Sequence, residues 1–203
     1  MSADAMTPNQ AHTDPSFAMR PENKLMTKYR LAILLATLAI PGMPAAAATE
    51  CADGNENIAI PASSPTEDFI VRADGTALQH PSRLIWMRCA LGQTWTGSDC
   101  SGQADEMNWE AALQAANDFE FAGLDDWRLP NRNELGNIIE QRCHSPAINH
   151  GVFPSPPGGW FWSSSPAMGN SGQGWAVMFD DGQVQSVAIS GQYAVRLVRA
   201  GRE

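Results

Sequence analysis

Residues 125–135 read DDWRLPNRNEL, and they contain the start of a helix. Asn131 is a residue type that caps helix N-termini well, and Glu134 stands three positions later, as in a capping box. An apolar stripe follows at helical spacing, formed by Leu135, Ile138 and Ile139. The pattern predicts a helix over residues 132–142.

The structural motif of the chain stands immediately before this helix and consists of Trp127, Arg128, Leu129 and Pro130. Proline restricts the residue before it to extended backbone, so the motif must enter the helix as an extended segment. We expect the Trp127 indole to be buried. We also expect Arg128 to be hydrogen-bonded to neighbouring backbone or to a carboxylate.

The flanking sequence contains one more helix and several short strands. Asn108 caps a helical pattern that extends to about Phe121, and Gly123 is a suitable stop. Strands are expected at residues 69–72, 83–89, 160–164, 174–179, 183–189 and 194–199, with an Asp181-Gly182 hairpin turn. There is no internal repeat and no second core. These elements predict one α+β domain over residues 66–200, with two helices packed on short antiparallel strands.

The N-terminal 48 residues have a different character. Three basic residues (Lys24, Lys28 and Arg30) precede an apolar run at 31–40 and a small-residue run at 41–48, as in an export signal. The alternative, a transmembrane anchor, needs roughly 20 apolar residues. We expect residues 1–25 to be a non-native extension, 26–48 a signal peptide that starts at Met26, and 49–65 an extended lead. The protein is then exported to the periplasm, the cell surface or the medium, without membrane insertion.

Four cysteines follow the predicted signal, at positions 51, 89, 100 and 143. An even number in an exported chain indicates disulfides, and four cysteines allow three pairings. We favour Cys89–Cys100, which closes a short loop, together with Cys51–Cys143, which ties the lead to the body. Zinc is the competing hypothesis, but the cysteines include no CxxC pair, and Cys143-His144 is not a ligand spacing. No metal and no other cofactor is expected.

Charge restricts the possible partners. From residue 49 onward the chain has 9 Arg, no Lys and 19 Asp plus Glu, a net charge of −10. Phosphate binding depends on clustered basic residues, so nucleic acid is excluded, and an anionic membrane surface is a poor partner. The acidic doublets Asp125-Asp126 and Asp180-Asp181 are interpreted as turns rather than calcium ligands.

The motifs taken together resemble one family. They are LIWMRC (84–89), NWEAAL (108–113), DWRLPN (126–131), SPAIN (145–149), FWSSS (161–165) and YAVRLVR (193–199). From about residue 68 to 199 they resemble the Lcl C-terminal domain family, named for the terminal domain of Legionella collagen-like adhesins. The resemblance implies a compact fold related to C-type lectin-like domains and formylglycine-generating enzymes. With the expected disulfides, we predict a compact, disulfide-stapled, C-type lectin-like domain. It also implies exported bacterial proteins, some of which bind sulfated glycans. Here the net charge of −10 and the lack of Gly-X-Y repeats do not support a sulfated ligand or a collagen stalk.

Three functional hypotheses follow. The favoured one is an exported non-enzymatic module that binds a glycan or a surface protein. The alternative is a structural or loop-display subunit of a surface assembly, and the oligomeric state is not predicted. An enzyme of unknown type is the least favoured, because the chain has no GxSxG, HExxH or Walker A string.

A ligand face is expected where, as the resemblance implies, long loops and the C-terminal strands form one exposed surface. Trp160 and Trp162 alternate along a strand, and an exposed Trp suits stacking on sugar rings, although the pattern favours core packing for this pair. Arg196 is the nearest cation and could equally be a structural partner. The expected ligand is neutral or weakly charged. Its expected contacts are Trp160, Asp181, Gln183, Gln185 and Tyr193.

Overall fold

The computed structural model describes residues 50–117, 119–169 and 172–201, so the predicted extension and signal peptide lie outside the described residues. The described helices are short: α1 (Trp109–Gln114), α2 (Arg132–Gly136) and the 3-10 turns η1 (Ala52–Gly54) and η2 (Thr66–Asp68). The described strands are β1 (Phe69–Val71), β2 (Thr76–Gln79), β3 (Leu84–Met87), β4 (Thr94–Trp95), β5 (Cys100–Ser101), β6 (Glu106–Met107), β7 (Trp160–Pro166), β8 (Gln173–Met178), β9 (Gln183–Ala188), β10 (Tyr193–Ala194) and β11 (Val198–Ala200).

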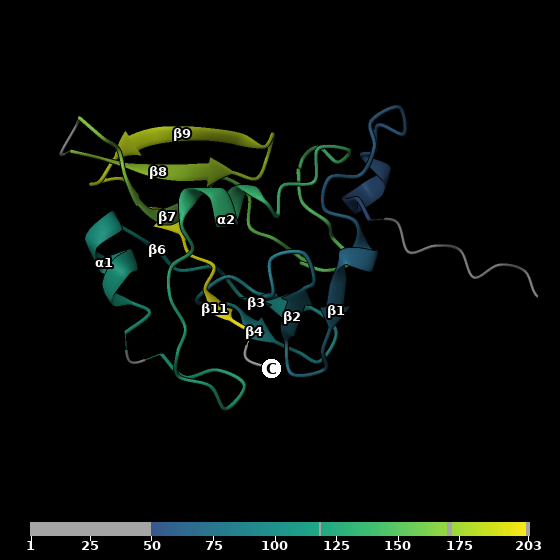
Figure 1. Cartoon of the computed structure of the whole chain (residues 1–203), viewed down its shortest axis with the longest axis horizontal. Coiled ribbons are helices and arrows are strands. Elements are labelled where there is room, and N and C mark those ends of the chain that lie inside the picture. The colour runs from purple at the N-terminus through teal and green to yellow at the C-terminus, as the bar shows by residue number, and fades with distance from the viewer. Residues whose placement is uncertain (1–49, 118, 170–171, 202–203) are drawn as a thin grey trace, which may run out of the picture. The chain divides into compact units, whose positions relative to one another are not determined.

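These strands form two main sheets and one small ribbon (Figure 1). The four-stranded sheet has the order β1-β2-β3-β11 and is antiparallel throughout. The five-stranded sheet has the order β6-β10-β7-β8-β9, and only its β10–β7 pair is parallel. The predicted hairpin is present, because β8 and β9 pair antiparallel on either side of Asp181-Gly182.

Two apolar clusters meet at β7. Phe161 belongs to one cluster, which also contains Trp86 of β3 and Leu135 of α2. Trp162 belongs to the other, which also contains Trp127 and residues of α1. Both β7 side chains have 0% exposure, so the strand is buried on both faces at these two positions, and the two sheets pack on a shared interior.

The prediction of an α+β, C-type lectin-like domain with two helices packed on strands is wrong. The described residues are 11% helical and 32% strand, so the described fold is mainly β. α2 ends at Gly136 instead of residue 142, because glycine is a poor helix former and the chain then turns so that Ile139 pairs with Ile148 in a β-bridge. α1 ends at Gln114, and Phe121 forms a bridge with Leu124 instead of a last helical turn. In both cases tertiary pairing overrides the helical pattern.

The predictions for the structural motif are confirmed. Trp127 is 4% exposed, and its indole N–H donates to the carbonyls of Phe121 and Leu124 at 3.2 and 3.1 Å. Arg128 donates to both carboxylate oxygens of Glu134, at 2.8 and 2.7 Å. The capping box is also present: the Asn131 side chain accepts from the Glu134 N–H, and Glu134 accepts from the Asn131 N–H.

The Arg128–Glu134 pair gives a pH prediction. The hydrogen bonds that Arg128 donates to the Glu134 carboxylate lower the pKa of Glu134 below the ordinary 4.5. The pair therefore stabilises the fold fully above that value, and its contribution is lost as the pH falls through the lower folded-state pKa. Because the Arg128 side chain is 45% exposed, we expect a loss of less than about 1 kcal/mol. Urea unfolding from neutral pH to about pH 3 should show this loss in the parent but not in Glu134→Gln, which keeps the capping bond. An unchanged pH dependence in the variant would contradict the assignment.

The disulfide pairings are confirmed as Cys51–Cys143 and Cys89–Cys100. Among the described residues no cysteine is free, so thiolate ligands for zinc are not available there. The same residues include no helix with the length and apolar character needed to cross a bilayer.

Candidate functional site: a row of side chains across the five-stranded sheet

Strand register places four side chains in one line on the sheet. Ala194 pairs with Phe161 in parallel, which sets Tyr193 level with Trp160. Trp160 pairs with Met178, and Met178 pairs with Gln183. Partners in register project from the same face, so Tyr193, Trp160, Met178 and Gln183 form what we call the cross-strand row. The row crosses β10, β7, β8 and β9 and spans about 14 Å, which is three strand spacings.

The aromatic end of the row rests on a buried ring. Trp162 is fully buried, and its indole N–H donates to the Met107 carbonyl at 2.8 Å. The Tyr193 ring centroid lies 4.7 Å from Trp162 and 6.3 Å from Trp160, with tilted planes. Trp160 and Tyr193 are only partly buried. Core packing is therefore the role of Trp162, whereas the other two rings are partly exposed at the surface.

The polar end of the row is held by a chain of hydrogen bonds. Asp181, Gln183 and Gln185 are all exposed. The Asp181 carboxylate accepts from the Gln183 backbone N–H at 3.1 Å and from the Gln183 side-chain amide. The Gln185 amide in turn donates to the Gln183 side-chain oxygen. Gln183 and Gln185 project from the face of the row, and Asp181 lies in the turn that leads into β9.

The structure thus brings the five predicted contacts onto one region of the sheet, and it adds Met178, which the sequence interpretation missed. Side chains alternate between the two faces along residues 174–179, so the sequence alone places Met178 on the same face as Ala176. The neighbours of Met178 on β7 and β9 could not be predicted, because they depend on strand register.

Arg196 does not belong to this site. Its side chain is fully buried, and it donates to the backbone carbonyls of Met87, at 2.9 Å, and of Arg88. Its guanidinium lies 4.8 Å from the Phe153 ring centroid and 5.7 Å from that of Phe161. Burial, and secondarily the charge of Arg88, lowers the pKa of Arg196 to about 9. Arg196 is a structural cation, and the cross-strand row has no basic side chain among its members.

The described surface also has two adjoining hollows that do not coincide with the row. They have volumes of about 480 and 470 Å³ and share Gly136, Ile139 and Gln141. Asp181 lines the second, together with Val184. No aromatic side chain lines either hollow, so they lack the stacking surface that the row provides.

The acidic doublets are engaged in structural contacts. Asp126 accepts from the Arg199 guanidinium at 3.0 Å, and Asp180 accepts from the Gly159 N–H at 3.1 Å. Within residues 50–117, 119–169 and 172–201, no three His, Cys, Asp or Glu side chains are grouped so that they could hold a metal ion.

Comparison with known proteins gives one match. A family model described as the Lcl C-terminal domain matches residues 75–199, a range that contains the whole cross-strand row. No curated protein matches the chain.

Proposed function

Because the chain belongs to the Lcl C-terminal domain family, we propose that it is an exported, non-enzymatic binding module whose ligand is a neutral or weakly charged glycan. The two disulfides support export, because such bonds persist in oxidising compartments such as the periplasm and the cell exterior. The cysteines described in the structure are all in disulfides, which leaves no thiolate there for nucleophilic catalysis. Nucleic acid and anionic membranes are not proposed as partners, because the net charge of −10 from residue 49 onward repels them.

The cross-strand row is the observation that supports the ligand class. Partly exposed rings at Trp160 and Tyr193 offer flat apolar surface for the C–H face of a sugar. Amides at Gln183 and Gln185 both donate and accept hydrogen bonds, which suits hydroxyl groups. The row and the neighbouring Asp181 carry one negative charge and no positive charge, so a sulfated chain would find no ionic partner on them.

A binding experiment follows from this arrangement. We expect a neutral glycan selected on an array to bind the protein with affinity that depends weakly on salt, since no ion pairs form. Trp160→Ala and Tyr193→Ala should each weaken binding about tenfold or more, because each removes a stacking surface. Calorimetry with the selected neutral glycan and with a sulfated glycosaminoglycan, across a salt series, measures both effects.

Trp175→Ala is the matched control for these substitutions. Trp175 pairs with Ser186 and projects from the opposite face of the same sheet, where it stacks under Arg132 at 4.4 Å. Its loss should leave glycan affinity unchanged. Steeply salt-sensitive binding of the sulfated glycan alone, unaffected by Trp160→Ala and Tyr193→Ala, would overturn both the ligand class and its location.

A further inference from the structure

β9 is an open edge of the five-stranded sheet. In the described residues β9 pairs only with β8, so the backbone N–H and C=O groups on its outer side have no strand beside them (Figure 1). The strand has six residues, reads QVQSVA and contains no charged residue, no glycine and no proline. Six consecutive pairs with β8 show no register shift, so no bulge twists this edge away.

The other sheet edges are protected. β6 has two residues, one of them Glu106, and β1 has three residues followed by Arg72. The outer side of β11 is occupied, because Val198 forms a β-bridge with Arg128. Natural proteins shorten, charge or cover their edges because an open edge pairs with other strands. In the part of the chain that the structure describes, β9 has none of these protections.

We propose that β9 is a self-association surface, on which β9 of a second copy of this chain pairs antiparallel about a two-fold axis at Gln185. A strand edge is self-complementary under such an axis, as a symmetric dimer interface requires. The side chains fit this occupant. One N–H of the Gln185 side-chain amide donates to Gln183. The oxygen and the second N–H of that amide can bond to the Gln185 amide of the second copy.

The acidic doublet Asp180-Asp181 favours the antiparallel orientation over a parallel one. The doublet lies in the turn that precedes the N-terminal end of β9. Antiparallel pairing about Gln185 sets Asp181 opposite Ile189 of the partner and Asp180 opposite Ser190 of the partner. A parallel arrangement would bring the two acidic doublets together. The uncharged side chains of β9 also offer no ionic partner to a charged extended peptide of another protein.

This dimer goes beyond the proposed glycan binding. A two-fold axis perpendicular to the sheet keeps each face on its own side, so the cross-strand rows of the two copies lie on the same face. Such a dimer presents two ligand sites together, which raises avidity for a repeating glycan. Because only one strand pairs, the interface is small, and we expect a weak dimer whose population rises with concentration.

Charge variants at Gln185 test the pairing by sedimentation velocity of the purified chain without ligand. Gln185→Lys and Gln185→Glu place like charges opposite each other, so each should weaken self-association about tenfold or more. A mixture of the two variants sets Lys against Glu, and it should restore the dimer. Added salt should strengthen the parent dimer, because it screens the repulsion between two acidic molecules.

Gln114→Lys and Gln114→Glu are the matched controls, since Gln114 is exposed at the end of α1 and undergoes the same charge changes. Both should dimerise like the parent. A parent chain that stays monomeric at its highest reachable concentration would overturn the proposal, and so would equal effects at positions 114 and 185. Trp160→Ala and Tyr193→Ala should dimerise normally, so failure of glycan binding and failure of self-association are separate results.

Discussion

Trp127→Ala is expected to lower the free energy of unfolding by about 3 to 5 kcal/mol, as large aromatic truncations in cores do. The ring is 4% exposed and lies edge-on to Phe121, with centroids 6.0 Å apart. Alanine would leave a cavity in the cluster that contains Ala112 and Leu129. The substitution would also remove the indole N–H that donates to the carbonyls of Phe121 and Leu124.

Denaturant unfolding measures this loss. Trp127→Phe keeps most of the packing and removes the two hydrogen bonds, so it should cost about 1 to 2 kcal/mol. Trp160→Ala is a second comparison, because that ring is partly exposed and its removal should cost less than that of Trp127. A change below about 1 kcal/mol for Trp127→Ala would mean that the ring is not part of the core.

Removal of the Cys51–Cys143 disulfide is expected to lower the free energy of unfolding by about 4 to 5 kcal/mol, because this disulfide closes a loop with a sequence separation of 92. Removal of the Cys89–Cys100 disulfide, whose sequence separation is 11, should cost about 3 kcal/mol and serves as the comparison. In the chain-entropy account the difference arises in the unfolded state, where the longer loop gains more freedom. Paired substitutions to alanine, followed by denaturant unfolding, measure both losses.

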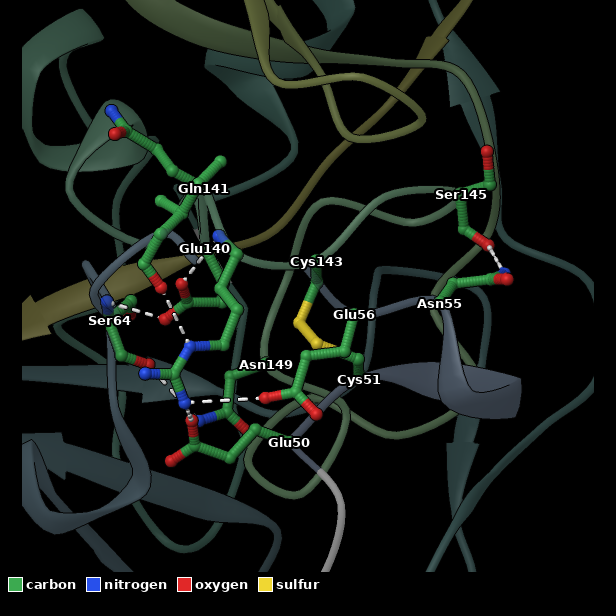
Figure 2. The surroundings of a disulfide bond; sticks show 12 residues. Glu50, Cys51, Asn55, Glu56, Ser64, Glu140, Gln141, Cys143, Ser145 and Asn149 are labelled. Carbon is green, nitrogen blue, oxygen red and sulfur yellow. Dashed lines mark hydrogen bonds and ion pairs between the residues drawn. A yellow bond between two sulfur atoms is a disulfide. The ribbon is translucent and has the colours of Figure 1, made fainter. Parts of the chain in front are cut away.

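The surroundings of Cys51–Cys143 explain why the folded state should survive its removal (Figure 2). The buried Glu140 carboxylate accepts from the backbone N–H groups of Ser63, Ser64 and Arg142, at 2.8 to 3.1 Å. The Arg142 guanidinium also donates to Glu56 at 3.3 Å. These bonds keep the lead attached without the disulfide. A smaller loss for Cys51–Cys143 than for Cys89–Cys100 would contradict the loop-entropy explanation.

Local chemistry accounts for what the sequence predicted well. The capping box at Asn131 and Glu134, the extended approach at Pro130 and the side-chain bonds from Arg128 to Glu134 depend on residues within six positions of one another. The strands 160–164, 174–179 and 183–189 also correspond to observed strands, because alternation and the Asp-Gly turn are local signals. The cysteine pairing followed from export and from loop length.

Long-range pairing decided the rest. Residues 194–199 were predicted as one strand, yet β10 joins the five-stranded sheet and β11 joins the four-stranded sheet. Val195, Arg196 and Leu197 are buried where the chain passes between them.

The sequence by itself determined which residues begin the helices, which cysteines can pair and which segments are extended, because those properties depend on near neighbours. Only the tertiary structure decided that both helices stop early, that Arg196 is buried, and that Tyr193, Trp160, Met178 and Gln183 form one row. The physical reason is strand register. A shift of one residue moves every side chain of a strand to the opposite face, and register is set by packing across the whole domain.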